Sequence, residues 1–155
     1  MWRVAGSVIL GYIVMAAFVF ISFSLLYVAM GPDRAYQPGT FEVSGLWVVV
    51  SFVLSFSAAV LGGWVCVLIA KTELGPQILA AAILVFGLVL ALMEPSSAPA
   101  DVPAVRDASV GVMDAMRYSR NPAWINFANP FVAVIGILLG ANLVGSKKPE
   151  PVLEL

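Results

Sequence analysis

Residues 4–30 have the sequence VAGSVILGYIVMAAFVFISFSLLYVAM, and these 27 residues include no Asp, Glu, Lys or Arg. An α-helix rises about 1.5 Å per residue and the hydrocarbon core of a bilayer is about 30 Å thick, so about 20 apolar residues are enough to cross it. The apolar stretch is also much longer than that of a secretory signal peptide, and no small-residue cleavage site follows it. We therefore expect an uncleaved transmembrane helix.

Three further segments are apolar and are predicted as spans, although they are shorter: residues 46–70, 76–93 and 130–145. The second and third spans are joined by a short turn over residues 71–75, where Gly75 suits the end of a helix. Pro76 suits the first position of the next helix, because the N–H that proline lacks has no partner there. The sequence thus predicts an all-α fold, a four-transmembrane-helix bundle that forms one domain over residues 1–155.

Two polar segments, residues 31–45 and 94–129, connect the remaining spans, and a polar tail follows at residues 146–155. In the longer segment, apolar side chains recur at helical spacing and charged side chains lie toward the opposite side. The apolar set is Val105, Ala108, Val112, Ala115 and Met116, and the charged set is Arg106, Asp107, Asp114 and Arg117. This pattern predicts a short amphipathic helix within residues 102–118 with a solvated ion-pair face; a loop without helix is the alternative.

The distribution of Lys and Arg bears on orientation. Four spans place both chain ends and the turn on one side of the membrane, and that side carries Arg3, Lys71, Lys147 and Lys148. These cations lie within a few positions of helix ends, in about 20 residues, whereas the four on the other side are spread over about 50 residues. We expect both termini in the cytoplasm, with the turn and tail inside and the two longer loops outside.

Composition excludes several classes of function. The chain is 61% hydrophobic and only 11% charged, with a net charge of −1, and it has no basic cluster for nucleic acid. It contains no His and a single cysteine, Cys66, which removes the commonest metal ligands, a Ser-His-Asp site and a thiol pair. We expect no enzyme activity, no metal and no cofactor; Asp107 and Asp114 are the only carboxylates that a lipid-directed enzyme could use.

Small residues at helical spacing mark the faces where membrane helices meet, because close approach of backbones replaces the hydrophobic effect there. The predicted packing residues are Ser51, Ser55, Ala59, Gly62 and Gly63 in the second span, Gly87 in the third, and Gly136 and Gly140 in the fourth. The last two form a GxxxG pattern. These stripes predict contacts within the bundle, and a homo-oligomer formed through the GxxxG is the alternative.

No ionisable side chain falls within the four predicted spans, which argues against transport coupled to protons or ions. Asn142, Ser51 and Ser55 remain as the polar groups of a path through the membrane. Two functions follow as hypotheses. The first is a non-catalytic structural or accessory component of a larger membrane complex, with the second outer loop as its recognition surface. The second is a small oligomeric transporter or channel for a neutral or weakly polar solute.

Residues 58–71, AAVLGGWVCVLIAK, are followed by a short turn, a third span, a polar loop with proline and tryptophan, and a closing span that ends LLGANLVG. This layout resembles a group of small uncharacterised bacterial inner-membrane proteins with four predicted helices and a GG-aromatic motif in the second span. The resemblance implies a bacterial inner membrane as the location and implies no activity.

Overall fold

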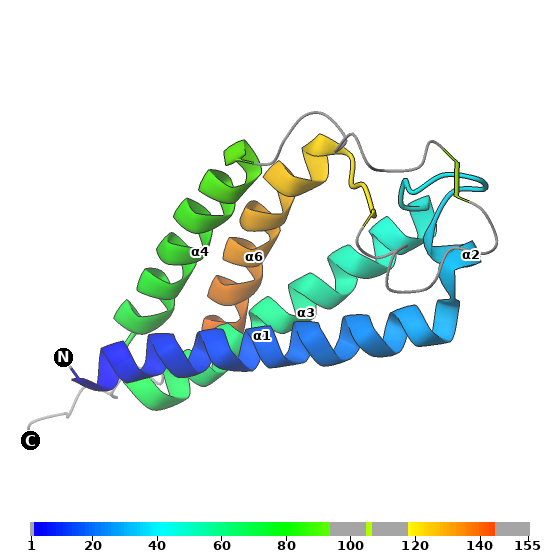
Figure 1. Ribbon diagram of the computed structural model, residues 1–155. Coiled ribbons are helices and arrows are strands. Elements are labelled where there is room, and N and C mark those ends of the chain that lie inside the picture. Colours follow the sequence, from blue (N-terminus) through cyan, green and yellow to red (C-terminus); the bar gives the residue numbers. More distant parts are fainter. Residues whose placement is uncertain (1, 94–104, 107–117, 145–155) are drawn as a thin grey trace, which may run out of the picture.

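The computed structural model describes residues 2–93, 105–106 and 118–144. The described part is helical apart from its turns and connections and contains two isolated β-bridges (Figure 1). Its helices are α1 (Trp2–Met30), α2 (Pro32–Ala35), α3 (Gly45–Ala70), α4 (Leu74–Met93) and α6 (Ala123–Leu143). Helices α1, α3, α4 and α6 are each long and apolar enough to cross a membrane, which confirms the predicted four-helix membrane bundle.

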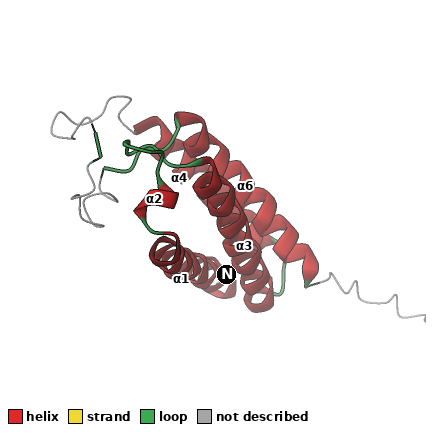
Figure 2. Ribbon diagram, turned by 90° about the vertical axis from the view of Figure 1, so that its right-hand side faces the viewer, coloured by secondary structure: helices red, strands yellow, loops and turns green. Residues whose placement is uncertain are grey.

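The four long helices alternate in direction. The starts of α1 and α4 and the ends of α3 and α6 lie together, and we call this the turn end; the opposite end is the loop end (Figure 1). Helix α3 lies between α1 and α6, while α4 packs mainly on α6 (Figure 2). Helices α1 and α4 are close at the turn end and diverge toward the loop end (Figure 1). The bundle is therefore closed at one end and splayed at the other.

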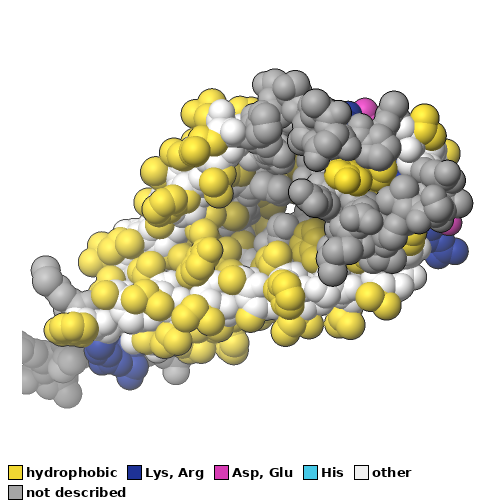
Figure 3. All heavy atoms as spheres, viewed as in Figure 1, with side chains coloured by type: hydrophobic (Ala, Val, Ile, Leu, Met, Phe, Trp, Pro, Cys, Tyr) yellow, Lys and Arg dark blue, Asp and Glu magenta, His cyan; other side chains and the backbone are white. Residues whose placement is uncertain are grey.

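The outside of the bundle is apolar. Large side chains such as Phe20, Phe86 and Leu92 are exposed on the helices. Hydrophobic side chains cover the visible faces of α1 and α4, and the Lys and Arg side chains in view lie toward the two ends (Figure 3). In water such a surface would drive aggregation, whereas hydrocarbon chains of a bilayer solvate it.

Helix α6 begins at Ala123, seven residues before the start that we predicted near Pro130. The prediction was wrong because it treated the proline as a helix start. Pro130 lies inside the helix, where its missing N–H removes one backbone hydrogen bond. The ring of the proline also needs room, which a small residue on a neighbouring helix can provide. Here the neighbour is α4: a Cβ built on Gly87 would lie 2.5 Å from Cγ of Pro130.

The turn between α3 and α4 also differs from the prediction. Lys71, and not Gly75, ends α3 in a left-handed conformation (φ 55°, ψ 24°), and its N–H donates to the carbonyl of Val67 at 2.8 Å. Because α4 begins at Leu74, Gly75 lies within its first turn. A Cβ on Gly75 would lie 2.8 Å from Oγ of Ser7. This glycine is thus required for close packing on α1 and not for a turn.

Ser44 caps the start of α3. Its hydroxyl oxygen accepts a hydrogen bond from the N–H of Trp47 at 3.1 Å, and the hydroxyl donates to the carbonyl of Arg34 at 2.6 Å. We expect Ser44→Ala to lower the free energy of unfolding by about 1 kcal/mol, as for other N-caps. Ser44→Thr keeps both hydrogen bonds and should cost much less. Unfolding by SDS in mixed micelles measures both; equal losses would contradict the capping role.

Candidate functional site

Helices α3 and α6 touch through their backbones. A Cβ on Gly63 would collide with the carbonyl oxygen of Ile137, and a Cβ on Gly140 would collide with that of Val60. A Cβ on Gly136 would lie 2.6 Å from Cβ of Ala59. The GxxxG of the fourth span therefore faces α3 of the same chain. That contact occupies the face that we considered for a homo-oligomer.

Helices α1 and α3 also pack closely at glycines. Gly11 lies so close to α3 that a Cβ on it would be 3.0 Å from the carbonyl oxygen of Gly62, and a Cβ on Gly62 would collide with the side chain of Met15. Toward the turn end, the thiol of Cys66 lies 3.5 Å from Oγ of Ser7, and both residues are fully buried. The turn half of the bundle is consequently a closed core.

The structure does not bring the predicted polar path together. Asn142 lies near the end of α6 at the turn end and is exposed. Ser51 and Ser55 lie in the half of α3 nearest the loop end. The closed contacts at Gly62 and Gly63 separate the two sites. Asn142 therefore does not share a cavity with either serine, and the three residues do not line one route.

A cavity of about 360 Å³ lies in the splayed half of the bundle, and all four long helices contribute to it. Its walls are largely apolar, from residues such as Val19 on α1 and Leu90 on α4. Three polar side chains also line it: Ser55 from α3, and Asn126 and Asn129 from α6. Ser55 was predicted as a packing or path residue; the asparagines join it because α6 starts earlier than the sequence suggested.

The first connecting loop, residues 31–44, is folded. Tyr36 and Val43 form an antiparallel bridge, and the end of the second loop adds to it through a parallel bridge between Glu42 and Arg120. The N–H of Val43 donates to the carbonyl of Arg120 at 3.1 Å, and the N–H of Arg120 donates to that of Phe41 at 2.9 Å. We call this unit, residues 31–44 with 105–106 and 118–122, the loop-end cap. The side chains of Tyr36, Phe41 and Val43 are buried in it.

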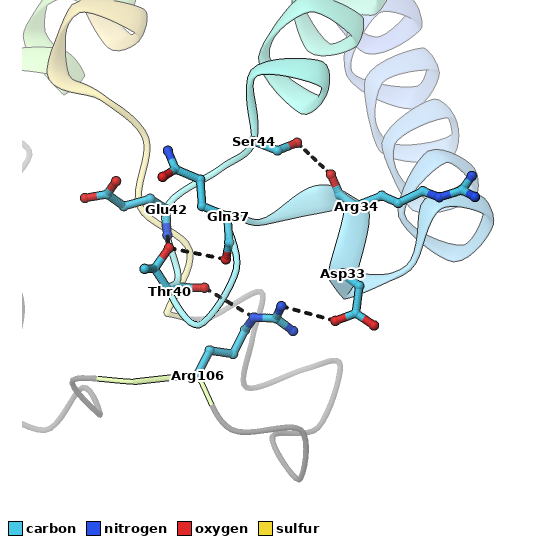
Figure 4. Close-up of polar contacts among 7 residues, drawn as sticks. All are labelled: Asp33, Arg34, Gln37, Thr40, Glu42, Ser44 and Arg106. Carbon is cyan, nitrogen blue, oxygen red and sulfur yellow. Dashed lines mark hydrogen bonds and ion pairs between the residues drawn. The ribbon is translucent and has the colours of Figure 1, made fainter.

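Arg106 joins the second loop to the first (Figure 4). Its Nε donates to the carbonyl of Thr40 at 3.2 Å, and its guanidinium forms an ion pair with Asp33, also at 3.2 Å. The guanidinium carbon lies 5.7 Å from the centre of the Tyr36 ring, a cation–π distance. Only 10% of the Arg106 side chain is exposed. One arginine therefore contacts three parts of the first loop.

The predicted amphipathic helix is wrong at the positions that the structure describes. Val105 and Arg106 are not helical, Val105 is 65% exposed, and Arg106 is the buried member of the pair. The sequence pattern had predicted the opposite, with Val105 on the apolar face and Arg106 on the solvated face. The buried contacts of the arginine come from residues far away in the sequence, which helical spacing cannot register. The rest of that predicted helix, including Asp107 and Asp114, lies outside the described residues.

Aromatic side chains connect the cap to the bundle beneath it. The ring of Tyr27 in α1 lies edge-on to that of Tyr36 at 6.3 Å and to that of Trp47 at 5.8 Å. Beneath the cap, Phe52 of α3 stacks on Trp124 at the start of α6 at 5.9 Å and joins these two helices to each other. Such pairs add to the stability that burial gives. The position of the cap is therefore coupled to the helices that carry it.

Residues with acid–base or metal-binding chemistry are scarce in the described part of the chain. Within the described ranges, no group of three or more His, Cys, Asp or Glu side chains could hold a metal. Of Lys, Arg, Asp and Glu, the four long helices contain only Arg3, next to the start of α1. These features define a multi-pass α-helical membrane protein with a folded cap at one end. The chain matches no protein-family model, no curated protein and no solved structure in the comparisons made.

Proposed function

We propose that this protein is a non-catalytic accessory or structural component of a membrane and that it engages a partner protein through the loop-end cap. The observation that carries the proposal is Arg106, which fixes two separate loops into one surface outside the bundle. A loop that merely connected two membrane spans would not need an arginine held by contacts with another loop. A fixed surface loses little conformational entropy when a partner binds.

The helices support the same proposal. Their glycine contacts close the core at the turn end, and the described part of the four long helices carries no Lys, Arg, Asp or Glu except the exposed Arg3 at the start of α1. Movement of a solute needs two alternating openings or a continuous polar route. The separation of Asn142 from Ser51 and Ser55 gives no support to such a route.

For the location we propose a bacterial inner membrane with both termini in the cytoplasm. The turn end then faces the cytoplasm with Arg3 and Lys71, and Lys147 and Lys148 follow α6 in the sequence. Cations close to helix ends favour this orientation. The loop-end cap then faces the periplasm, and its partner would be a membrane protein with a periplasmic surface.

The experiment is site-specific photo-crosslinking in cells. A photoreactive phenylalanine analogue replaces Gln37, which is exposed in the cap, or Thr72, which is exposed at the turn end. We expect one discrete protein adduct from position 37 and none from position 72. The adduct should disappear when Arg106→Ala is added and persist when Arg34→Ala is added. Absence of the adduct at position 37, or its persistence in the Arg106→Ala background, would contradict the proposal.

A further inference from the structure

We infer that the cavity in the splayed half of the bundle binds an uncharged lipid that carries a hydroxyl or carbonyl group, such as a diacylglycerol. The polar group of the lipid would meet Ser55 and Asn129, and its hydrocarbon would lie between α1 and α4. This inference is independent of the partner proposed for the cap. It depends on three observations: the polar groups in the cavity, the absence of charged side chains among its described lining residues, and its place in the bilayer.

Two of the polar side chains that line the cavity have no hydrogen-bond partner in the described part of the chain. Among the described residues, neither the hydroxyl of Ser55 nor the amide of Asn129 makes a hydrogen bond. Ser57, two positions further along α3, shows the usual arrangement, since its hydroxyl donates to the carbonyl of Val53 at 2.8 Å. In hydrocarbon an unsatisfied amide or hydroxyl is costly, because no water replaces the missing partner. A ligand with its own donor and acceptor removes that cost.

The cavity also indicates the charge of its ligand. None of the described side chains that line it is Lys, Arg, Asp or Glu. A phosphate or ammonium headgroup would lie there without a counter-ion, which is unfavourable at low dielectric constant. The amide of Asn129 has both donors and an acceptor, so it can donate to and accept from a single neutral group such as a hydroxyl.

The place of the cavity selects a lipid over a protein helix. All four walls belong to helices that can span a membrane, and two of these helices, α1 and α4, diverge toward the loop end (Figure 1). Leu90 lines the cavity and is also exposed to the surrounding bilayer. A volume of about 360 Å³ can hold the polar end of such a lipid with its acyl chains extending between α1 and α4, whereas a helix is about 10 Å across with its side chains and would not fit. A hydrocarbon chain can enter sideways.

The test uses the full chain in nanodiscs and a diazirine-bearing diacylglycerol, compared with a diazirine-bearing phosphatidylglycerol of the same chains. We expect saturable labelling of α4 and α6 by the diacylglycerol and weaker labelling by the charged lipid. Asn129→Leu should reduce the apparent affinity about threefold to tenfold, the loss expected for one hydrogen bond. Ala91→Phe, which fills the cavity, should abolish saturable labelling.

Ala81→Phe is the matched control, because Ala81 is exposed on the same helix and does not line the cavity. It should label as the unchanged chain does. Circular dichroism melting of every variant shows whether the bundle is folded. If Ala91→Phe does not fold, Ser55→Ala replaces it as a milder variant, and we expect Ser55→Ala to weaken the labelling. Equal labelling by the two lipids, or labelling that Asn129→Leu and Ser55→Ala leave unchanged in folded protein, would overturn the inference.

Discussion

Gly140→Ala is expected to lower the free energy of unfolding by about 3 kcal/mol, near the upper end of the range for overpacked sites. The added methyl group would occupy the place of the Val60 carbonyl oxygen, which is backbone and cannot rotate away. Helices α3 and α6 would have to separate along their length, and the close packing that stabilises membrane helices would be lost. Unfolding by SDS in mixed micelles, followed by circular dichroism, measures the change.

Gly6→Ala is the matched control, since a Cβ on Gly6 of α1 meets no atom within 4 Å. Its effect should stay within about 0.5 kcal/mol. Gly63→Ala acts on the same contact from the other helix, next to Ile137. The double variant Gly63→Ala with Gly140→Ala should cost less than the sum of the two, because the helices separate only once. Full additivity, or an unchanged Gly140→Ala protein, would show that α3 and α6 are not in backbone contact.

The four spans could be predicted because crossing a bilayer imposes a length and a polarity on consecutive residues. Residues 46–70 and 76–93 were predicted, and the helices found are Gly45–Ala70 and Leu74–Met93. Proline and glycine signals were less informative. In soluble proteins a proline often marks the start of a helix and a glycine its end. Here Pro130 and Gly75 both lie inside helices, at positions where a neighbouring helix packs closely against them. Such contacts cannot be read from the neighbouring sequence.

The loop-end cap could not be predicted for a related reason. Arg106 lies 66 residues after Thr40 and 73 after Asp33, so no local pattern connects them. The cavity was missed in part because the predicted start of the fourth span left Asn126 and Asn129 in a loop. Ser55 was predicted as a packing or path residue; its polar neighbours in the cavity are these asparagines and not Asn142. Only the fold could supply that grouping.

Arg106→Ala is expected to destabilise the loop-end cap while the helices stay folded. It removes the hydrogen bond to the Thr40 carbonyl, the ion pair with Asp33 and the contact with the Tyr36 ring. Hydrogen bonds of charged groups contribute about 1.5–3 kcal/mol, so a loss of about 2 kcal/mol is reasonable. Amide hydrogen exchange over residues 36–44 should then be about 30-fold faster, since about 1.4 kcal/mol corresponds to a factor of ten. Exchange mass spectrometry measures it.

Arg34→Ala is the control for the loss of one positive charge from the same loop. The side chain of Arg34 is directed away from the cap contacts, and its backbone carbonyl still accepts from Ser44 after the substitution (Figure 4). Exchange in residues 36–44 should be unchanged in this variant. If Arg34→Ala accelerated exchange as much as Arg106→Ala, the effect would belong to net charge and not to the buried contacts.

Two further variants separate the contacts that Arg106 makes. Asp33→Asn removes the ion pair, but the Asp33 side chain is 91% exposed, so water screens it and the loss should stay below about 1 kcal/mol. Arg106→Lys keeps the charge but has no planar fork with which to reach Thr40 and Asp33 together, so its effect should fall between those of Asp33→Asn and Arg106→Ala. The order expected is therefore Arg106→Ala, Arg106→Lys, Asp33→Asn. An Asp33→Asn effect as large as that of Arg106→Ala would assign the stability of the cap to the exposed ion pair, and the buried carbonyl and ring would then contribute little.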